Sequence, residues 1–337
     1  MKRNQKNYQL LWDLSNHVGG LLSARTAGKR PKFPKAYSKE LRNSLRNLAW
    51  LDQITGVGIG LKTSGPDNNQ SSNLSELCLQ FTVRRKVATG RLDRDHLIPK
   101  FIRLEHLGRN IPTDVIAAPA LAVAHAPALA GRLAAQNIGP MGAVTAVATD
   151  DANQAYAIGC AHVFVPPSNP QTGIPIESPP DNNSSTIANP IGGLFAWVDL
   201  QNSPGLLLDA ALVKLDSPSQ ASNTFPDGSS FGPVVPHSDV LHQPVRMFRS
   251  SIQNWAFGSV FQANYSQLIS YSDFGNITVN GLYVILINNS EGDSGSPVFL
   301  DNNERGTLSM HIAGDNRSLA FSTPFVSVLD NWGLTLI

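Results

Sequence analysis

Hydrophobic residues recur along the chain at two different spacings, and these spacings divide it into regions. Near the N-terminus the apolar positions follow intervals of three, four and seven, which is the pattern of one face of an amphipathic helix. These positions are Leu10, Leu11, Leu14, Val18, Leu21 and Leu22. A basic proline-rich break at residues 29–35 separates them from a second helical pattern over residues 38–51. The sequence therefore predicts a basic helical segment over residues 1–51.

From residue 52 the apolar residues form short runs bounded by Gly, Pro, Asn and Ser, which is typical of strands and turns. Residues 52–117 contain four such runs and predict a small α/β module. The runs are 54–62, 77–83, 97–102 and 111–116. Gly56, Gly58 and Gly60 suggest a dinucleotide-binding loop, but no helix pattern follows them and they lie inside the strand run. We therefore read them as strand glycines.

Residues 118–137 are rich in Ala and Pro and predict a linker, with a short helix over residues 127–136 and His125 on the surface. Beyond it, residues 138–337 contain many short apolar runs separated by turn signals. This pattern predicts a third, antiparallel β domain. Its expected strands cover 142–147, 156–160, 195–200, 206–215, 245–248, 259–263, 277–279, 283–287 and 308–314.

The turn with the clearest chemistry is Glu291-Gly292-Asp293-Ser294-Gly295-Ser296-Pro297, between two strand candidates. Glycines beside a serine let the backbone bend so that the Gly292 and Ser294 amides point at one place. There they could stabilise an oxyanion while Ser294 Oγ acts as nucleophile. The alternative for this turn taken alone is an ordinary Gly/Ser/Asp loop.

Two upstream residues complete a hydrolytic triad. His162 lies near the end of the apolar run 157–163, and Asp209 lies inside the apolar run 206–215. A carboxylate in such a run needs a partner, and an imidazole that must be held in one tautomer is a suitable one. We predict His162 as general base, Asp209 as its orienting acid and Ser294 as nucleophile, with Asp199 and Asp216 as rival acids. The order His, Asp, Ser is that of chymotrypsin.

The motifs resemble those of trypsin/chymotrypsin-like serine peptidases: Gly-Cys-Ala-His at 159–162, Asp-Ala-Ala-Leu-Val-Lys-Leu at 209–215 and Gly-Asp-Ser-Gly-Ser-Pro at 292–297. The ordered series Gly-Val-Gly-Ile-Gly, Arg-Arg-Lys, Leu-Ile-Pro and Ile-Pro-Thr-Asp-Val-Ile over residues 54–117 resembles the N-terminal module of NAL1-like serine peptidases. The resemblance implies a mainly β fold, a chymotrypsin-like double antiparallel β-barrel. A helical N-terminal segment and a small α/β module would precede it, with the triad in the cleft between the barrels.

The same resemblance implies a substrate pocket lined by Asn288, Asn289, His311 and Gly314. Asn288 is uncharged, so a preference for Lys or Arg is not supported. The strand 308–314 resembles that of viral 3C-like and glutamyl peptidases, whose histidine binds Gln or Glu in S1, the pocket for the P1 residue before the cleaved bond. An imidazole can donate to such side chains. The alternative is that His311 is a buried, satisfied histidine.

Asp293 matches the residue that pairs with a newly released N-terminus in trypsin. No obvious activation site precedes residue 138. We therefore expect Asp293 to have an internal partner or none.

The composition of the chain limits the kinds of binding partner that it indicates. The chain has 26 Lys and Arg against 25 Asp and Glu, so it shows no general bias towards nucleic acid or anionic membranes. The basic residues 1–51 leave a nucleic-acid-binding arm as one alternative, although a solvated helical face explains them more simply. No run of 18 apolar residues and no signal core is present.

Cys78 and Cys160 fall in different halves of the chain, which favours a reduced, cytoplasmic setting. We predict a serine endopeptidase with a protein or peptide substrate, no metal and no cofactor, and we leave homo-oligomerisation open. The rival functions are a pseudo-protease that binds a peptide without cutting it and an esterase.

Overall fold

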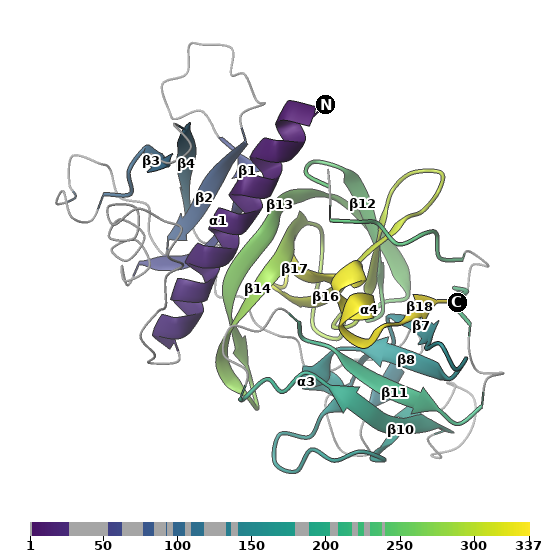
Figure 1. Cartoon of the computed structure of the whole chain (residues 1–337). Coiled ribbons are helices and arrows are strands. Elements are labelled where there is room, and N and C mark those ends of the chain that lie inside the picture. The colour runs from purple at the N-terminus through teal and green to yellow at the C-terminus, as the bar shows by residue number, and fades with distance from the viewer. Residues whose placement is uncertain are drawn as a thin grey trace.

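A computed structural model describes residues 2–26, 53–62, 77–83, 92, 97–104, 109–117, 133–135, 141–178, 189–202, 208–217, 222–225, 230–237 and 240–337. It is mainly β, with an N-terminal helix and two sheets of ten and eight strands (Figure 1). This confirms the fold class predicted from the sequence. The expected helix over 38–51 lies outside the described residues.

The ten-stranded sheet contains a closed barrel, which we call the second barrel because its strands follow most of the eight-stranded sheet along the chain. Its strands are β12 (Pro244–Arg249), β13 (Asn254–Tyr271), β14 (Gly275–Leu286), β15 (Pro297–Leu300), β16 (Thr307–Gly314) and β17 (Leu319–Pro324). The order β12-β15-β16-β17-β14-β13 is closed by an additional pairing of β12 with β13. Helix α4 (Phe325–Trp332) follows β17 and ends at Gly333, whose positive φ of 62° forms a left-handed cap.

The other sheet has eight strands. Its order is β18 (Thr335–Leu336), β7 (Ala146–Thr149), β8 (Ala155–Gly159), β11 (Ala211–Leu215), β10 (Asn189–Trp197), β9 (Pro175–Ser178), β5 (Leu133–Ala135) and β6 (Met141–Ala143). Strands β6 and β7 stand near opposite ends of this order but are separated along the chain only by Val144 and Thr145. The sheet therefore curls back on itself.

An N-terminal layer extends the ten-stranded sheet. Strand β1 (Ile54–Leu61) pairs with β13, and β2 (Leu77–Val83), β4 (Arg109–Ala117) and β3 (Phe101–Leu104) follow outward. Helix α1 (Lys2–Thr26) lies across β1, β13 and β14 (Figure 1). It buries five of the six predicted apolar residues against this sheet: Leu11, Leu14, Val18, Leu21 and Leu22.

The glycines of β1 have a packing role. A Cβ at Gly56 or Gly58 would come within 2.2 or 2.6 Å of the Tyr265 side chain, and one at Gly60 within 2.0 Å of Gln80. Tyr265 is buried and donates its hydroxyl to Thr82 Oγ1 at 2.6 Å. The repeated glycines therefore make room for side chains of the neighbouring strands, in agreement with their interpretation as strand glycines.

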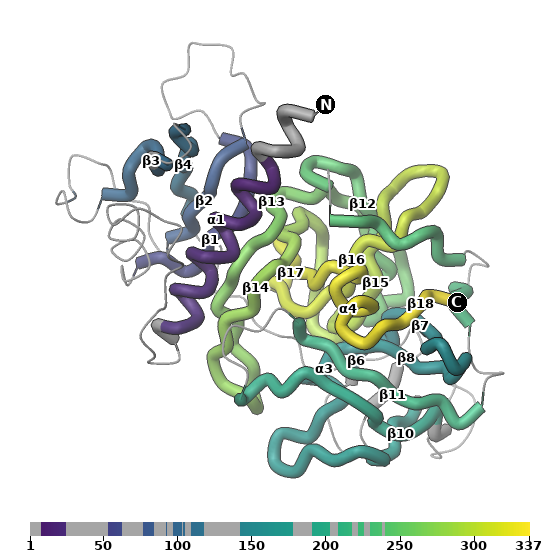
Figure 2. Tube along the Cα trace, viewed as in Figure 1, coloured from purple at the N-terminus to yellow at the C-terminus, as the bar shows by residue number. Residues whose placement is uncertain are grey.

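Several expected elements differ from the structure. The predicted short helix over 127–136 is contradicted at its end, because residues 133–135 form β5. Residues 127–132 and His125 lie outside the described residues. The run 277–279 and residues 283–286 of the run 283–287 belong to one continuous strand, β14, which pairs along its length with the long β13 (Figure 2). None of the helices among the described residues is both long enough and apolar enough to span a membrane.

Candidate active site

His162 is positioned by a short helix. Strand β8 ends at Gly159, and the four-residue helix α3 (Ala161–Phe164) follows at once. A Cβ at Gly159 would lie 2.3 Å from the Phe164 ring, so glycine lets this helix fold back against the strand. The expected strand 156–160 corresponds to β8, and the apolar run 157–163 continues beyond it because the chain turns into α3 after Gly159. His162 is only 7% exposed.

Asp209 lies two residues before the start of β11 and is completely buried. Its Oδ2 is 2.6 Å from His162 Nδ1, and its Oδ1 accepts the backbone N–H of His162 at 3.1 Å. The rival acids lie elsewhere: Asp199 is exposed and accepts hydrogen bonds within its own turn, and Asp216 is exposed. The geometry therefore leaves Asp209 as the acid that contacts the histidine.

Ser294 completes the chain of contacts, because its Oγ lies 3.0 Å from His162 Nε2. A carboxylate can only accept, so the proton on the imidazole belongs on Nδ1 and the Nε2 lone pair faces the serine. The structure thus brings together His162, Asp209 and Ser294, from three distant parts of the chain, in the arrangement that activates a serine.

The loop that carries Ser294, residues 291–297, is called the nucleophile loop, and it is held in shape by its glycines and by the eight-stranded sheet. Gly292 and Gly295 both have a φ of 86°, in the left-handed region that favours glycine. A Cβ at Gly295 would lie 2.1 Å from the Ala143 carbonyl oxygen. The Ala143 amide donates to the Ser294 carbonyl and the Thr145 hydroxyl to the Gly295 carbonyl, both at 2.7 Å. These contacts place the predicted oxyanion-binding turn, Gly292 to Ser294, at the junction of the two sheets.

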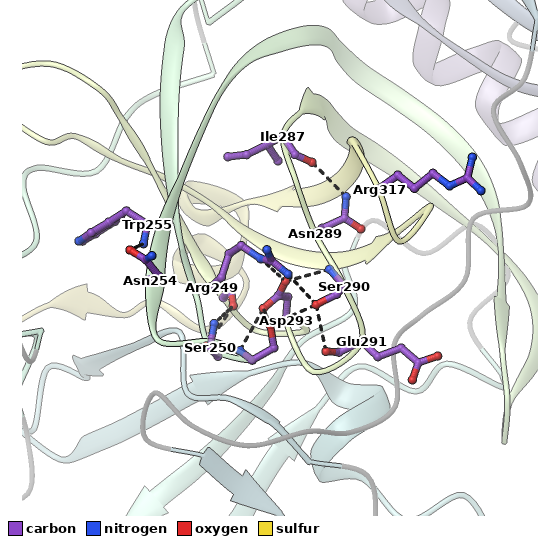
Figure 3. A network of polar contacts seen from close by, with 12 residues as sticks. Arg249, Ser250, Asn254, Trp255, Ile287, Asn289, Ser290, Glu291, Asp293 and Arg317 are labelled. Atoms are coloured by element: carbon purple, nitrogen blue, oxygen red, sulfur yellow. Dashed lines mark hydrogen bonds and ion pairs between the residues drawn. The ribbon is translucent and has the colours of Figure 1, made fainter.

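Asp293 has an internal partner, Arg249, at the end of β12. Arg249 Nε donates to Asp293 Oδ2 at 2.9 Å, and Arg249 Nη2 to Ser290 Oγ at 2.6 Å (Figure 3). The Ser251 amide and hydroxyl donate to Oδ1, and the Ser290 amide to Oδ2. Burial raises the pKa of Asp293. The hydrogen bonds from Ser251, the electrostatic effect of His311 and the Arg249 contact outweigh it, so the net pKa is lowered.

Sequence reasoning did not find Arg249. It follows the expected strand 245–248 as one arginine among many, and nothing local indicates that it reaches a residue 44 positions away. Only the pairing of β12 with β15 brings it beside the nucleophile loop.

The predicted pocket residues differ in their exposure to solvent. Asn289 is buried, and its side-chain amide donates to the carbonyls of Ile287 and Leu319. A Cβ at Gly314 would lie 2.0 Å from Asn289 Oδ1, so these two residues are in contact. Asn288 is exposed. Asn289 therefore has a structural role, because its side chain joins the end of β14 to the start of β17.

His311 lies on β16 beside the nucleophile loop and is completely buried. Its carbonyl accepts the Gly295 amide at 2.8 Å, and its amide donates to the Ser296 carbonyl at 2.9 Å. The next residue, Ile312, accepts a 3.4 Å contact from Ser294 Oγ through its carbonyl. His311 is therefore built into the wall next to the nucleophile, although its burial also fits the structural alternative.

A thiol lies next to the triad. Cys160 Sγ, a His162 ring nitrogen and an Asp209 oxygen lie within 4.8 Å of one another, close enough to be considered as metal ligands. However, burial, helped by the charge of Asp209, raises the pKa of the Cys160 thiol well above its ordinary value. The thiol donates to the His311 carbonyl at 3.4 Å. This cluster is accordingly better explained as a triad with a protonated thiol packed behind it. Cys78 and Cys160 are both buried, and neither forms a disulfide in the structure.

No protein-family model matches the chain, and no curated protein matches it. Its structure is similar to those of chymotrypsin-fold serine proteases. Thermobifida fusca protease A is 15% identical over 63% of this chain and 99% of its own, with a TM-score of 0.44. The Nocardiopsis protease is 19% identical over 63% and 99%, with a TM-score of 0.43. A glutamic acid-specific serine protease is 16% identical over 62% and 100%, with a TM-score of 0.45. The likeness concerns the fold, so the case for a function rests on the site geometry.

Proposed function

We propose that this protein is a serine endopeptidase that hydrolyses peptide bonds through an acyl-enzyme. The observation that carries the proposal is the continuous chain of contacts from Asp209 through both ring nitrogens of His162 to Ser294 Oγ, at 2.6 and 3.0 Å. Three side chains from separate elements meet at hydrogen-bond distance in the order that general-base activation requires.

The geometry supports one sequence of steps. Ser294 Oγ attacks the scissile carbonyl carbon while its proton passes to His162 Nε2, and the carbonyl oxygen becomes an oxyanion facing the Gly292 and Ser294 amides. His162 then gives the proton to the leaving amine as the C–N bond breaks. Water attacks the acyl-enzyme in the second half, with His162 again taking and returning a proton. Throughout, Asp209 stabilises the imidazolium.

We propose that the substrate is a specific protein partner, cleaved after a Gln or Glu residue at P1. The support is the position of His311 in the wall beside Ser294, because an imidazole donates to a carboxamide or carboxylate oxygen. We further propose that the chain is a NAL1-like peptidase, because of the ordered motifs over residues 54–117. We propose a cytoplasmic location because Cys78 and Cys160 are buried and neither forms a disulfide in the structure.

The activity is tested with a fluorophosphonate probe, which acylates only an activated serine. The wild-type protein should be labelled, and Ser294→Ala and His162→Ala should not, because one lacks the nucleophile and the other the base. Circular dichroism confirms that both variants are folded. A folded wild-type protein that stays unlabelled at all pH values would favour the pseudo-protease, whose site binds without cutting.

The P1 preference is tested with a peptide library and a His311→Leu variant of similar volume. Peptides with Gln or Glu at P1 should be cleaved faster than those with Leu or Lys. The variant should lose that preference by about tenfold to a hundredfold, the effect of losing one hydrogen bond to a polar group. Its thermal unfolding and its rate of probe labelling serve as controls. A preference that survives the substitution would identify His311 as purely structural.

A further inference from the structure

Tyr271 connects the second barrel to Asp209, the acid that contacts His162. It is the last residue of β13 and pairs with Gly275, so residues 272–274 form the turn of the long β13–β14 hairpin. Gly275 has a φ of 75°, which permits this tight turn. The stem of the same hairpin pairs with β1 and is covered by α1. Figure 2 shows the hairpin running from that layer towards the region of α3.

The Tyr271 side chain is buried against the triad. It is 3% exposed, and its ring centroid lies 5.3 Å from that of His162 at an angle of 56°. Its hydroxyl is buried and makes no hydrogen bond at standard geometry to the residues that the structure describes. Burial is the largest cause that raises the pKa of Tyr271, and the charge of Asp209 and its interaction with the hydroxyl raise it further. The hydroxyl is therefore a protonated donor close to a buried carboxylate.

A buried hydroxyl without a partner is costly, and so is a buried carboxylate with few donors. Asp209 receives two N–H groups, both from His162. A carboxylate has about four lone-pair sites, so it can accept a further donor. The interaction between the Tyr271 hydroxyl and Asp209 gives each of these groups a partner.

We propose that Tyr271 is a positioning residue of the triad, whose hydroxyl donates to the Asp209 carboxylate and fixes it from the second barrel. The proposal rests on the proposed peptidase function for its kinetic consequences but not for the contact itself. A third donor holds the plane of the carboxylate that orients His162. It also shares the negative charge that faces the imidazole.

The pH dependence follows from the groups that face His162 on every side. These are Asp209 before β11, Cys160 at the end of β8, Ser294 in the nucleophile loop and Tyr271 at the end of β13. Cys160 and Tyr271 both remain protonated because burial raises their pKa values. Asp209 is thus the charged group that Tyr271 modulates, and removing the hydroxyl should favour the protonated imidazole.

The test is Tyr271→Phe, which keeps the ring and removes the donor. The kcat/KM should fall roughly tenfold or more, the cost of a lost hydrogen bond to a charged group, with KM unchanged. The acid limb of the pH profile should move to higher pH. The control is Tyr156→Phe, on β8 of the eight-stranded sheet, which removes a hydroxyl that donates to Asp150 at 3.0 Å. A merely structural tyrosine would lower activity without moving the acid limb, and that result would overturn the proposal.

A second measurement separates this proposal from the proposed function. The proton between His162 Nδ1 and Asp209 should give a low-field NMR signal, assigned by its loss in His162→Ala. That signal should shift in Tyr271→Phe and stay unchanged in Tyr156→Phe, whether or not the protein cleaves peptides. An unchanged signal in Tyr271→Phe refutes the contact. A missing fluorophosphonate reaction in the wild type refutes only the peptidase activity.

Discussion

Asp209→Asn is expected to lower kcat/KM by about 10⁴-fold while leaving the fold intact. In the wild type the Asp209 carboxylate accepts from His162 Nδ1 at 2.6 Å, so the Nε2 lone pair is directed at Ser294 Oγ. An asparagine can present its NH₂ group to Nδ1, and the imidazole would then carry its proton on Nε2. In that tautomer the ring cannot accept the serine proton, although every side chain keeps its place.

The control for this substitution is Asp199→Asn, which makes the same chemical change at the exposed rival acid. It should leave kcat/KM within about twofold, because substitutions at exposed sites have small effects. Steady-state kinetics on a cleaved peptide and fluorophosphonate labelling rates measure both variants. Equal losses in the two, or full activity in Asp209→Asn, would contradict the assignment of Asp209.

The elements that sequence could predict are those with local signals. The spacing of Leu11, Leu14 and Val18 predicts α1, and all three are buried in the structure. The Gly-Asp-Ser-Gly turn predicts a bent loop because its glycines must take positive φ, and Gly292 and Gly295 do so. The candidate triad could be named because each member lies in a motif that can be read over a few residues.

The elements that sequence could not predict depend on contacts between distant strands. The closure of the barrel by β12 and β13 leaves no mark on the local pattern. The same holds for the pairing of β1 with β13, which joins the N-terminal layer to the second barrel. Arg249 and Tyr271 are individually ordinary residues at strand ends. They acquire a place beside the candidate site only because β12 and the β13–β14 hairpin carry them there.

The N-terminal layer and the candidate site share the β13–β14 hairpin. Helix α1 is bound to β13 by specific contacts: Ser15 Oγ donates to the Asn264 carbonyl at 2.7 Å, and Asn264 Nδ2 to the Trp12 carbonyl at 2.9 Å. Seven residues beyond Asn264 the same strand ends at Tyr271, against His162. The N-terminal layer therefore supports the strand that reaches His162, and this strand connects it physically to the candidate site.

Arg249→Met is expected to have the second large effect, a loss of about 3–5 kcal/mol in the free energy of unfolding, because it leaves a buried charge unpaired. Asp293 is fully buried, and Arg249 is the basic residue in its ion pair among those that the structure describes. Since Asp293 is adjacent to Ser294, the rate of fluorophosphonate labelling should fall as well. Chemical denaturation followed by tryptophan fluorescence measures the stability. Arg317→Met, at an exposed position, is the control for removing one positive charge.

The pH dependence distinguishes a lost charge pair from lost packing. In the wild type the pKa of Asp293 is lowered from 3.8, so its stabilising contribution is complete above that value and disappears as the pH falls below it. In Arg249→Met one of the lowering causes is gone and burial drives the pKa upward, so the charged form is penalised at neutral pH. The difference in unfolding free energy between the wild type and Arg249→Met should therefore be widest near pH 7 and narrow on acidification.

The double variant Arg249→Met/Asp293→Asn, which has neither charge, should recover most of the lost unfolding free energy at pH 7. A gap that is independent of pH and is not reduced in the double variant would mean that Arg249 acts through packing alone.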